Sequence, residues 1–339
     1  MPDALTVLAA VLIAIVPSLI YLAILNAIDR YEKEPWSILL ACLGAGAVIA
    51  PALSLVILVL LGRESTLPPA FAPGPQPDAI VGIVESLVLG LLLIGIVHSI
   101  RDEFDDILDG VIYGAAIGAG FGATESLLYV LGGTGELGWG TVVQLVVAGL
   151  NHAFYLAVLG AIMGWAQRLP RGQRYVAIGL GLGTATLLNA FHDTFPVILS
   201  RVLSQPDAAV GALARLAAEL VNWLGIITLA GIVVLSWRRE ARILYAELPD
   251  EVAAGVVPED DFAVLTSSGG RLNRQWRLLR TDGLGAVGRL RRRYALEGEL
   301  AFHKYRLMRA HRKPPPSERG DVLRAEIRSL ADTTPETTA

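Results

Sequence analysis

The sequence has little of what a soluble protein of its size places on its surface. Charged residues make up only 18% of the 339 residues, 53% are hydrophobic, and the mean hydropathy is +0.54. A single cysteine, Cys42, excludes an intramolecular disulfide. Lysine is nearly absent, since only three of the 28 basic residues are lysines. This composition excludes a soluble globular chain and indicates a polytopic membrane protein, and the preference for Arg over Lys favours a bacterial source.

Seven apolar runs are long enough to cross a bilayer. Because backbone groups in lipid must bond within their own segment, each run is predicted to be an α-helix. The runs cover residues 4–28, 36–62, 79–100, 107–132, 142–167, 174–200 and 208–237. The predicted fold class is therefore all-α. A transmembrane bundle of about seven spans occupies residues 1–237, and a helical tail follows over residues 238–339.

Basic residues in the loops predict the orientation of the bundle. They concentrate in the odd-numbered loops, at Arg30, Lys33, Arg101, Arg168, Arg171 and Arg174. Loops rich in Lys and Arg stay in the cytoplasm. We therefore expect a multi-pass protein of a bacterial cytoplasmic membrane, with its N-terminus outside and its C-terminal tail inside.

The tail differs in composition from the bundle. It holds 19 basic and 15 acidic residues, which leaves 9 and 17 in the membrane part. Two stretches, 271–280 and 289–307, are predicted to be basic amphipathic helices that either lie against an anionic leaflet or pack on each other. Residues 333–339 are expected to be disordered. The tail has no nucleotide-, zinc- or DNA-binding pattern, so no nucleic-acid partner is expected.

Polar residues at membrane depth are the strongest indication of a functional site. With a rise of about 1.5 Å per residue, six of them are predicted to share the outer half of the bilayer. These are Glu85, Glu125, His152, His192, Asp193 and Glu219. Taken singly, each could be a hydrogen-bond partner between helices. Their common depth favours a site, because charged groups inside spans are costly and usually functional.

Two further patterns bear on this cluster. Gly110, Gly114, Gly118 and Gly122 repeat every four residues, which predicts a face that another helix approaches closely. Glu125 follows on nearly the same face and is expected to point into the bundle. Arg215 and Glu219 stand one turn apart, and we interpret them as a structural ion pair.

Glutamate and histidine side chains in an intramembrane cavity suit amide hydrolysis. A carboxylate can take a proton from water and pass it to the leaving amine, while an imidazole or an amide supports the developing oxyanion. The same groups could hold a divalent metal such as zinc, although no HExxH motif is present and no Cys belongs to the cluster. Whether the site uses a metal or no cofactor therefore stays open.

Three segments carry a resemblance to a known family. They are Asp29-Arg-Tyr-Glu-Lys-Glu-Pro35, the block from Leu108 to Glu125 with Tyr129, and His152 with Gly160. Over residues 29–200 the chain resembles the PrsW family of intramembrane proteases, distant relatives of the CaaX prenyl proteases. The resemblance implies cleavage of single-pass membrane proteins, such as anti-sigma factors, near the outer face. It matches Phe121 and Glu125 to the family's F-x-x-x-E motif and His152 to its first histidine motif.

The chain departs from the family pattern at two places. The paired-glutamate motif E-E-x-x-K reads Glu85-Ser86-Leu-Val-Leu here, so the second acid and the Lys are missing. The last motif reads Asn189-Ala-Phe-His192-Asp193, in which Asp193 matches the family's acid or amide and Asn189 stands where His is usual.

The catalytic candidates are therefore Glu85, Glu125, His152, His192, Asp193 and Asn189. Glu85 is expected to act as the general base, with Glu125 as the acid or a positioning group. The predicted function is intramembrane proteolysis, and the predicted partners are membrane lipids and a single-pass protein substrate. The alternatives are a pseudoprotease that binds substrates without cutting them and, third, a transporter; a homo-oligomer is left open.

Overall fold

The computed structural model describes residues 3–29, 33–62, 79–100, 104, 106–132, 138–202, 208–267, 270–310 and 318–331. Every regular element in these residues is a helix, so the predicted all-α class is confirmed. The chain divides into two compact units. One comprises residues 1–29 and 34–233, and the other comprises residues 30–33 and 234–339.

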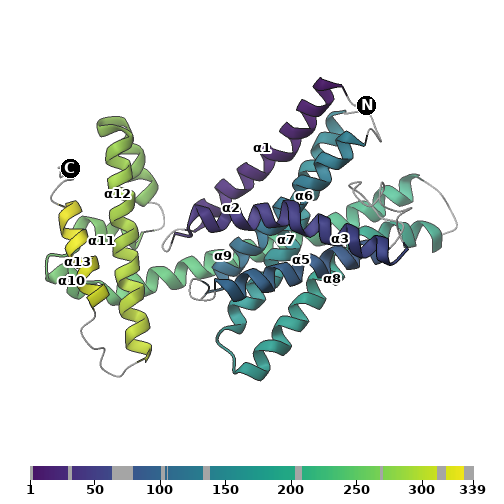
Figure 1. Cartoon of the computed structure of the whole chain (residues 1–339). Helices are drawn as coiled ribbons and strands as arrows, with labels where there is room; N and C mark the ends of the chain where they lie inside the picture. Colours follow the sequence, from purple (N-terminus) through teal and green to yellow (C-terminus); the bar gives the residue numbers. More distant parts are fainter. Residues whose placement is uncertain are drawn as a thin grey trace. The chain divides into compact units, whose positions relative to one another are not determined.

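The first unit is built of long helices (Figure 1). In chain order they are α1 (Ala4–Ile28), the continuous run of α2 (Trp36–Gly44), η1 (Ala45–Ile49) and α3 (Ala50–Leu60), then α5 (Ala79–Ser99), α6 (Ile107–Leu131), α7 (Trp139–Ala166), α8 (Arg171–Val202) and α9 (Ala208–Glu247). The last of these continues into the second unit, because the division falls after Val233.

Six helices in the described part of the chain are long and apolar enough to cross a membrane. They correspond to six of the seven predicted runs. The remaining run, 174–200, forms the 32-residue helix α8, which is not among the six. Its glycines and threonines, together with polar residues such as Asn189 and His192, dilute its apolar content. Hydropathy alone thus supports one span fewer than we predicted.

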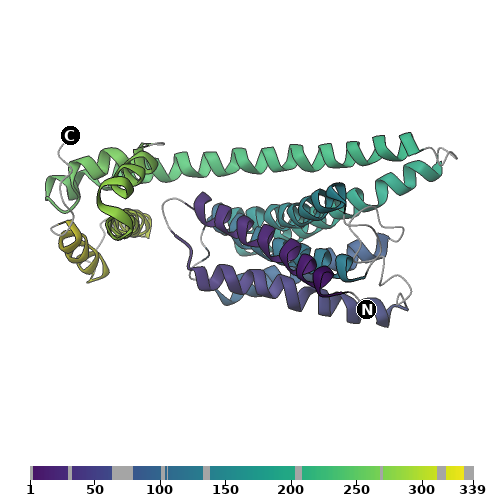
Figure 2. The ribbon, with the colours of Figure 1, turned by 90° about the horizontal axis from the view of Figure 1, so that it is seen from above.

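Helix α6 lies at the centre of the first unit. In the apolar 18-residue stretch of α6, 78% of the residues are buried, whereas in the corresponding stretch of α1, at the edge, 22% are buried. Helices α1, α2 and α7 all pack against it, and α7 makes the most extensive contact. Seen from a second direction, α1 still runs alongside the central helices (Figure 2). The candidate residues on α6 are therefore surrounded by protein.

The glycine stripe explains how α7 comes so close to α6. A Cβ atom added to Gly110 would lie 1.9 Å from the carbonyl oxygen of Gly160, and one on Gly114 would lie 2.2 Å from that of Leu156. Gly118 and Gly122 make similar approaches to the backbone of α7. Such separations are far below van der Waals contact, so only glycine permits this packing. The predicted close-packing face is confirmed.

Within the run from α2 to α3, Pro51 interrupts the backbone hydrogen bonding of the helix. Pro51 has no N–H to donate to the carbonyl oxygen of Ala47, four residues earlier. The hydroxyl of Thr124 on α6 donates to that oxygen instead, over 2.6 Å. Gly46 lies against the backbone of Ile117, where a Cβ would meet the carbonyl oxygen at 1.9 Å. The hydroxyl of Thr124 on α6 and the close approach of Gly46 to α6 thus hold the π-helical segment η1 in place.

The segment before α2 is hydrogen-bonded to the N-terminal half of α6. Asp29 and Glu34 are both buried. The backbone N–H of Glu34 donates to the carboxylate of Asp29, and the hydroxyl of Tyr113 donates to the carboxylate of Glu34. Two of the segments that carry the family resemblance are therefore joined by hydrogen bonds through Tyr113.

The second unit is a small helical domain with its own core. After the end of α9 it contains α10 (Pro249–Ala253), α11 (Glu259–Leu265), α12 (Gly270–Ala310) and α13 (Glu318–Ala331). Helix α12 is interrupted at Gly283, whose φ of 77° is in the left-handed region that favours glycine. Leu244, Leu290, Leu300 and Ile327 are among the residues of its core. The predicted disordered end, 333–339, lies outside the described residues.

The basic stretches of the tail pack on each other. Tyr294, Leu296, Leu300 and Phe302, which we expected on an amphipathic face, are buried in the core of the second unit. Asp261 is also buried, and it forms ion pairs with Arg274 and Arg293, at 2.7 and 2.5 Å. The apolar side of these helices therefore serves the fold of the unit. An approach of the unit to the membrane stays a prediction.

Candidate active site

Glu125 and His152 form a buried pair between α6 and α7. Oε2 of Glu125 lies 2.6 Å from Nε2 of His152, and both side chains are at most 10% exposed. The glycine stripe makes this contact possible, because Gly118 brings the backbone of His152 directly against α6. The ring of Phe121 meets the imidazole edge-on, with 4.9 Å between the centroids. Phe121 and Glu125 are four residues apart on one face and both hold the same histidine.

His192 on α8 takes part in a second pair. Its Nε2 atom lies 3.0 Å from Oε1 of Glu219 on α9 and 3.3 Å from Nδ2 of Asn151 on α7. One ring nitrogen either carries a proton or offers a lone pair. It can therefore donate to the carboxylate in one state and accept from the amide in the other. This geometry lets His192 change its partner when it gains or loses a proton.

Tyr155 stands between the two histidines. Its ring centroid lies 6.1 Å from that of His152 and 6.4 Å from that of His192. Its hydroxyl oxygen accepts a hydrogen bond of 2.9 Å from Nδ2 of Asn222 on α9. A phenolic hydroxyl is a donor as well as an acceptor of hydrogen bonds. The two histidine–glutamate pairs thus belong to one group of polar side chains from α6, α7, α8 and α9.

Asn189, one turn before His192, connects α8 to α5. Its Nδ2 atom donates to the hydroxyl oxygen of Ser86 over 2.8 Å and to the carbonyl oxygen of Gly82 over 3.2 Å. Glu85, next to Ser86, is buried as well. Positions 86 and 189 are two of the places where the chain departs from the family pattern. An uncharged hydrogen bond joins them here.

The structure describes the side chains of five of the six catalytic candidates, and it adds three polar residues to the site. Glu125, His152 and His192 come together as described above, whereas the side chain of Asp193 lies outside the described residues. Glu85, Glu125 and His152 are all buried, so none of them faces lipid. The distance between Glu85 and Glu125 stays a prediction.

Three residues of the site were not among our catalytic candidates: Asn151, Tyr155 and Glu219. We had assigned Glu219 to a structural ion pair with Arg215. Glu219 contacts His192, and its pairing with Arg215 stays a prediction. The side chain of Arg215 lies outside the described residues. A signal for Glu219 was present, because the sequence places it at the depth of the other acids. The position of Asn151 directly before His152 could also have drawn attention to it.

The donors that the structure describes at this site are arranged in pairs. Catalytic zinc takes three protein ligands at about 2 Å. In the part of the chain that the structure describes, no three His, Cys, Asp or Glu side chains are grouped closely enough to hold a metal ion. The described groups are pairs, and Nε2 of His152 and Oε2 of Glu125 already lie at hydrogen-bonding distance.

Comparison with known proteins identifies the family. The model of the PrsW family intramembrane metalloprotease matches residues 34–221, more than half of the chain. The match runs from α2 into α9 and contains both histidine–glutamate pairs. Comparisons with curated proteins and with solved structures gave no match. The family match, the apolar helices and the buried polar group agree: the chain belongs to the PrsW family of intramembrane metalloproteases, a family of membrane peptide hydrolases.

Proposed function

We propose that this protein cleaves single-pass membrane proteins of the anti-sigma-factor type, near the extracytoplasmic face of a bacterial cytoplasmic membrane. One observation carries the proposal. Two histidine–glutamate pairs, the buried pair of Glu125 with His152 and the partly exposed pair of Glu219 with His192, lie on either side of Tyr155. Ionisable groups at such positions in a membrane protein are costly and mark chemistry or transport. Membership in a protease family favours chemistry.

The pair of Glu125 and His152 is suited to general acid–base catalysis. A water oxygen bonds to the carbonyl carbon of the substrate peptide, and the proton of this water passes to the carboxylate–imidazole pair. The C–N bond then breaks, and the pair returns the proton to the leaving nitrogen. The short contact of 2.6 Å keeps the imidazole oriented for both transfers. No proton is gained or lost over the cycle.

The neighbouring amides and the tyrosine can stabilise the charge that develops on the carbonyl oxygen. Asn151 and Tyr155 supply an N–H and an O–H beside His152. Donors that are already oriented stabilise an oxyanion strongly in a site that excludes water. His192, held by Glu219, provides a further proton carrier beside the same tyrosine.

A metal, where the family uses one, would polarise the carbonyl or activate the water. The described residues supply pairs and not the three ligands of a zinc centre. The steps above therefore use this chain's own groups only.

A pseudoprotease is the second candidate, and the contact between Ser86 and Asn189 favours it. Positions 86 and 189 carry an acid and a histidine in the family pattern, whereas here they share an uncharged hydrogen bond of 2.8 Å. Such a bond can shape a substrate-binding surface but moves no proton at neutral pH.

The deciding experiment compares purified full-length protein with Glu125→Gln on one single-pass substrate in proteoliposomes. Gln keeps the size of the side chain and removes its acid–base chemistry, so cleavage should fall by roughly 10²-fold or more. Glu240→Gln is the matched control, because Glu240 is also buried but lies on α9 in the second unit. Near wild-type cleavage by Glu125→Gln would remove this residue from the mechanism. Binding without cleavage by both proteins would establish the pseudoprotease.

A further inference from the structure

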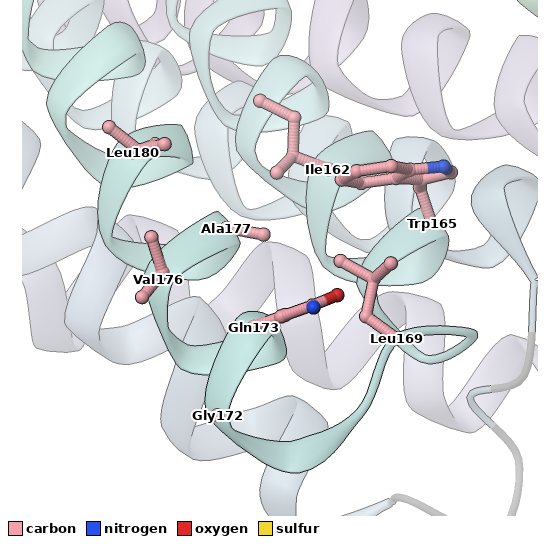
Figure 3. Close-up of a pocket in the computed structure, with 8 residues that line it drawn as sticks. All are labelled: Ile162, Trp165, Leu169, Gly172, Gln173, Val176, Ala177 and Leu180. Atoms are coloured by element: carbon pink, nitrogen blue, oxygen red, sulfur yellow. The ribbon is translucent and has the colours of Figure 1, made fainter.

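An apolar groove lies between the end of α7 and the beginning of α8 (Figure 3), and no residue of the histidine–glutamate pairs lines it. Its volume is about 550 Å³, within the range of small-molecule sites. Its main lining side chains are Ile162, Trp165, Leu169, Val176, Ala177 and Leu180. Gln173 supplies the polar side chain among the lining residues. The groove is thus suited to a hydrocarbon chain and offers little to a polar solute.

The position of the groove indicates that its ligand comes from the membrane. The apolar span of α7 ends at Ala166, so Ile162 and Trp165 belong to its last two turns. Trp165 is 47% exposed, and tryptophan at the end of a span is typical of the membrane interface. Across the groove, Val176 and Leu180 are 63% and 69% exposed. Exposed apolar side chains of this kind are favourable only when the surrounding medium is itself apolar, as the interior of a membrane is.

The turn that borders the groove is positively charged. Arg168, Arg171 and Arg174 each stand next to a lining residue in the sequence. No acidic residue occurs in the sequence from 137 to 192. Arg168 contacts Asp106 at 3.3 Å, and Arg174 donates to the carbonyl oxygen of Gln167, whereas Arg171 is exposed. Asp106 thus offsets one of the three arginines of the turn, and Arg171 stays exposed beside the lining residue Gly172.

We propose that this groove binds an anionic phospholipid, with one acyl chain along the apolar walls and the headgroup phosphate at the arginines. Guanidinium groups bind phosphate through two parallel hydrogen bonds, and basic pockets between transmembrane helices bind anionic headgroups. Charge complementarity favours this occupant over a zwitterionic lipid, whose ammonium group would be repelled. The site is separate from the proposed protease chemistry and does not depend on it.

The groove can be blocked without disturbing the fold. Gly172 lines it, and a Cβ atom added there meets no atom within 4 Å. Gly172→Trp should therefore fold and place an indole at the mouth of the groove. Gly183→Trp is the matched control, because Gly183 also has open space around its Cβ but lies about 16 Å further along α8 and does not line the groove. Arg171→Gln tests the charge, with the exposed Arg277→Gln in the tail as its control.

The measurement is native mass spectrometry of full-length protein after exposure to equal amounts of phosphatidylglycerol and phosphatidylcholine in mixed micelles. Wild type, Gly183→Trp and Arg277→Gln should retain phosphatidylglycerol in preference. Gly172→Trp should lose most of the retained lipid, and Arg171→Gln should weaken the preference roughly fivefold, which corresponds to about 1 kcal/mol for one basic residue at a membrane surface. Equal retention of both lipids by wild type would overturn the proposal. Undiminished phosphatidylglycerol binding by Gly172→Trp would also overturn it.

Discussion

The carbonyl oxygen of His152 occupies the space that a side chain on Gly118 would need. A Cβ atom at position 118 would lie 2.2 Å from this oxygen. The close approach continues seven residues later, where Glu125 meets the imidazole of His152. The packing of α6 on α7 and the geometry of the proposed acid–base pair are therefore one structural feature, and a change in the glycine stripe should affect both.

Gly118→Ala is expected to destabilise the bundle by about 1 to 3 kcal/mol, because the added methyl group meets backbone that must move away. The shift should also lengthen the contact between Glu125 and His152 and reduce proteolysis. Thermal unfolding in detergent measures the first effect, and cleavage measures the second. Gly95→Ala is the control, since its Cβ would meet nothing within 4 Å, and it should be neutral or slightly stabilising. A Gly118→Ala protein as stable as the Gly95→Ala protein would contradict the close packing.

Glu219→Gln tests the second pair. Loss of the carboxylate removes the partner of protonated His192 and should lower the turnover rate by roughly tenfold or more, with little change in substrate affinity. Glu240→Gln, on the same helix, should leave both the turnover rate and the substrate affinity unchanged. An unaltered turnover rate in Glu219→Gln would show that this pair only supports the fold.

The buried acids of the second unit should make its stability depend on pH. Burial, together with the negative charge of Asp261, raises the pKa of Glu297 well above its usual value of 4.5. The folded unit then holds a proton that the unfolded chain has released. This contribution to stability is complete below about pH 4.5 and is lost as the pH rises through the raised pKa. We expect the unit to become less stable between acidic and neutral pH.

Glu297→Gln should remove this pH dependence and stabilise the unit at pH 8 by about 1 to 3 kcal/mol, since it eliminates a buried charge. Hydrogen exchange of the α12 amides in the full-length protein, corrected for the intrinsic effect of pH, measures this. Glu299→Gln is the control on the same helix, because the ion pair of Glu299 with Arg319 is more exposed and contributes at most about 1 kcal/mol. A steeper pH dependence in Glu297→Gln would show that the sign is wrong.

The orientation can be tested with one engineered cysteine. The native Cys42 is buried and should react little. Ala325→Cys places a thiol on an exposed position of α13. With the tail in the cytoplasm, an impermeant maleimide should label this thiol only after the cells are permeabilised. Labelling of intact cells would place the tail outside, as would follow if α8 does not cross the membrane.

Local features of the sequence were sufficient to predict the helices and one half of the site. The period of the α-helix places Gly110, Gly114, Gly118 and Glu125 close to one face of α6, and this relation does not depend on any other helix. The composition of the runs likewise predicted the membrane class. Counting residues along the two predicted spans also predicted that Glu125 and His152 lie at the same depth.

The partners across helices were decided by the tertiary structure. Nothing in the local pattern of α9 indicates that Glu219 contacts His192, since this contact depends on how α8 and α9 pack. The same holds for Ser86 and Asn189, 103 residues apart. In the tail, the pattern of Tyr294 and Leu300 suited a membrane surface as well as a core. A helical period determines which residues share a face, whereas only the packing of several helices determines what that face meets.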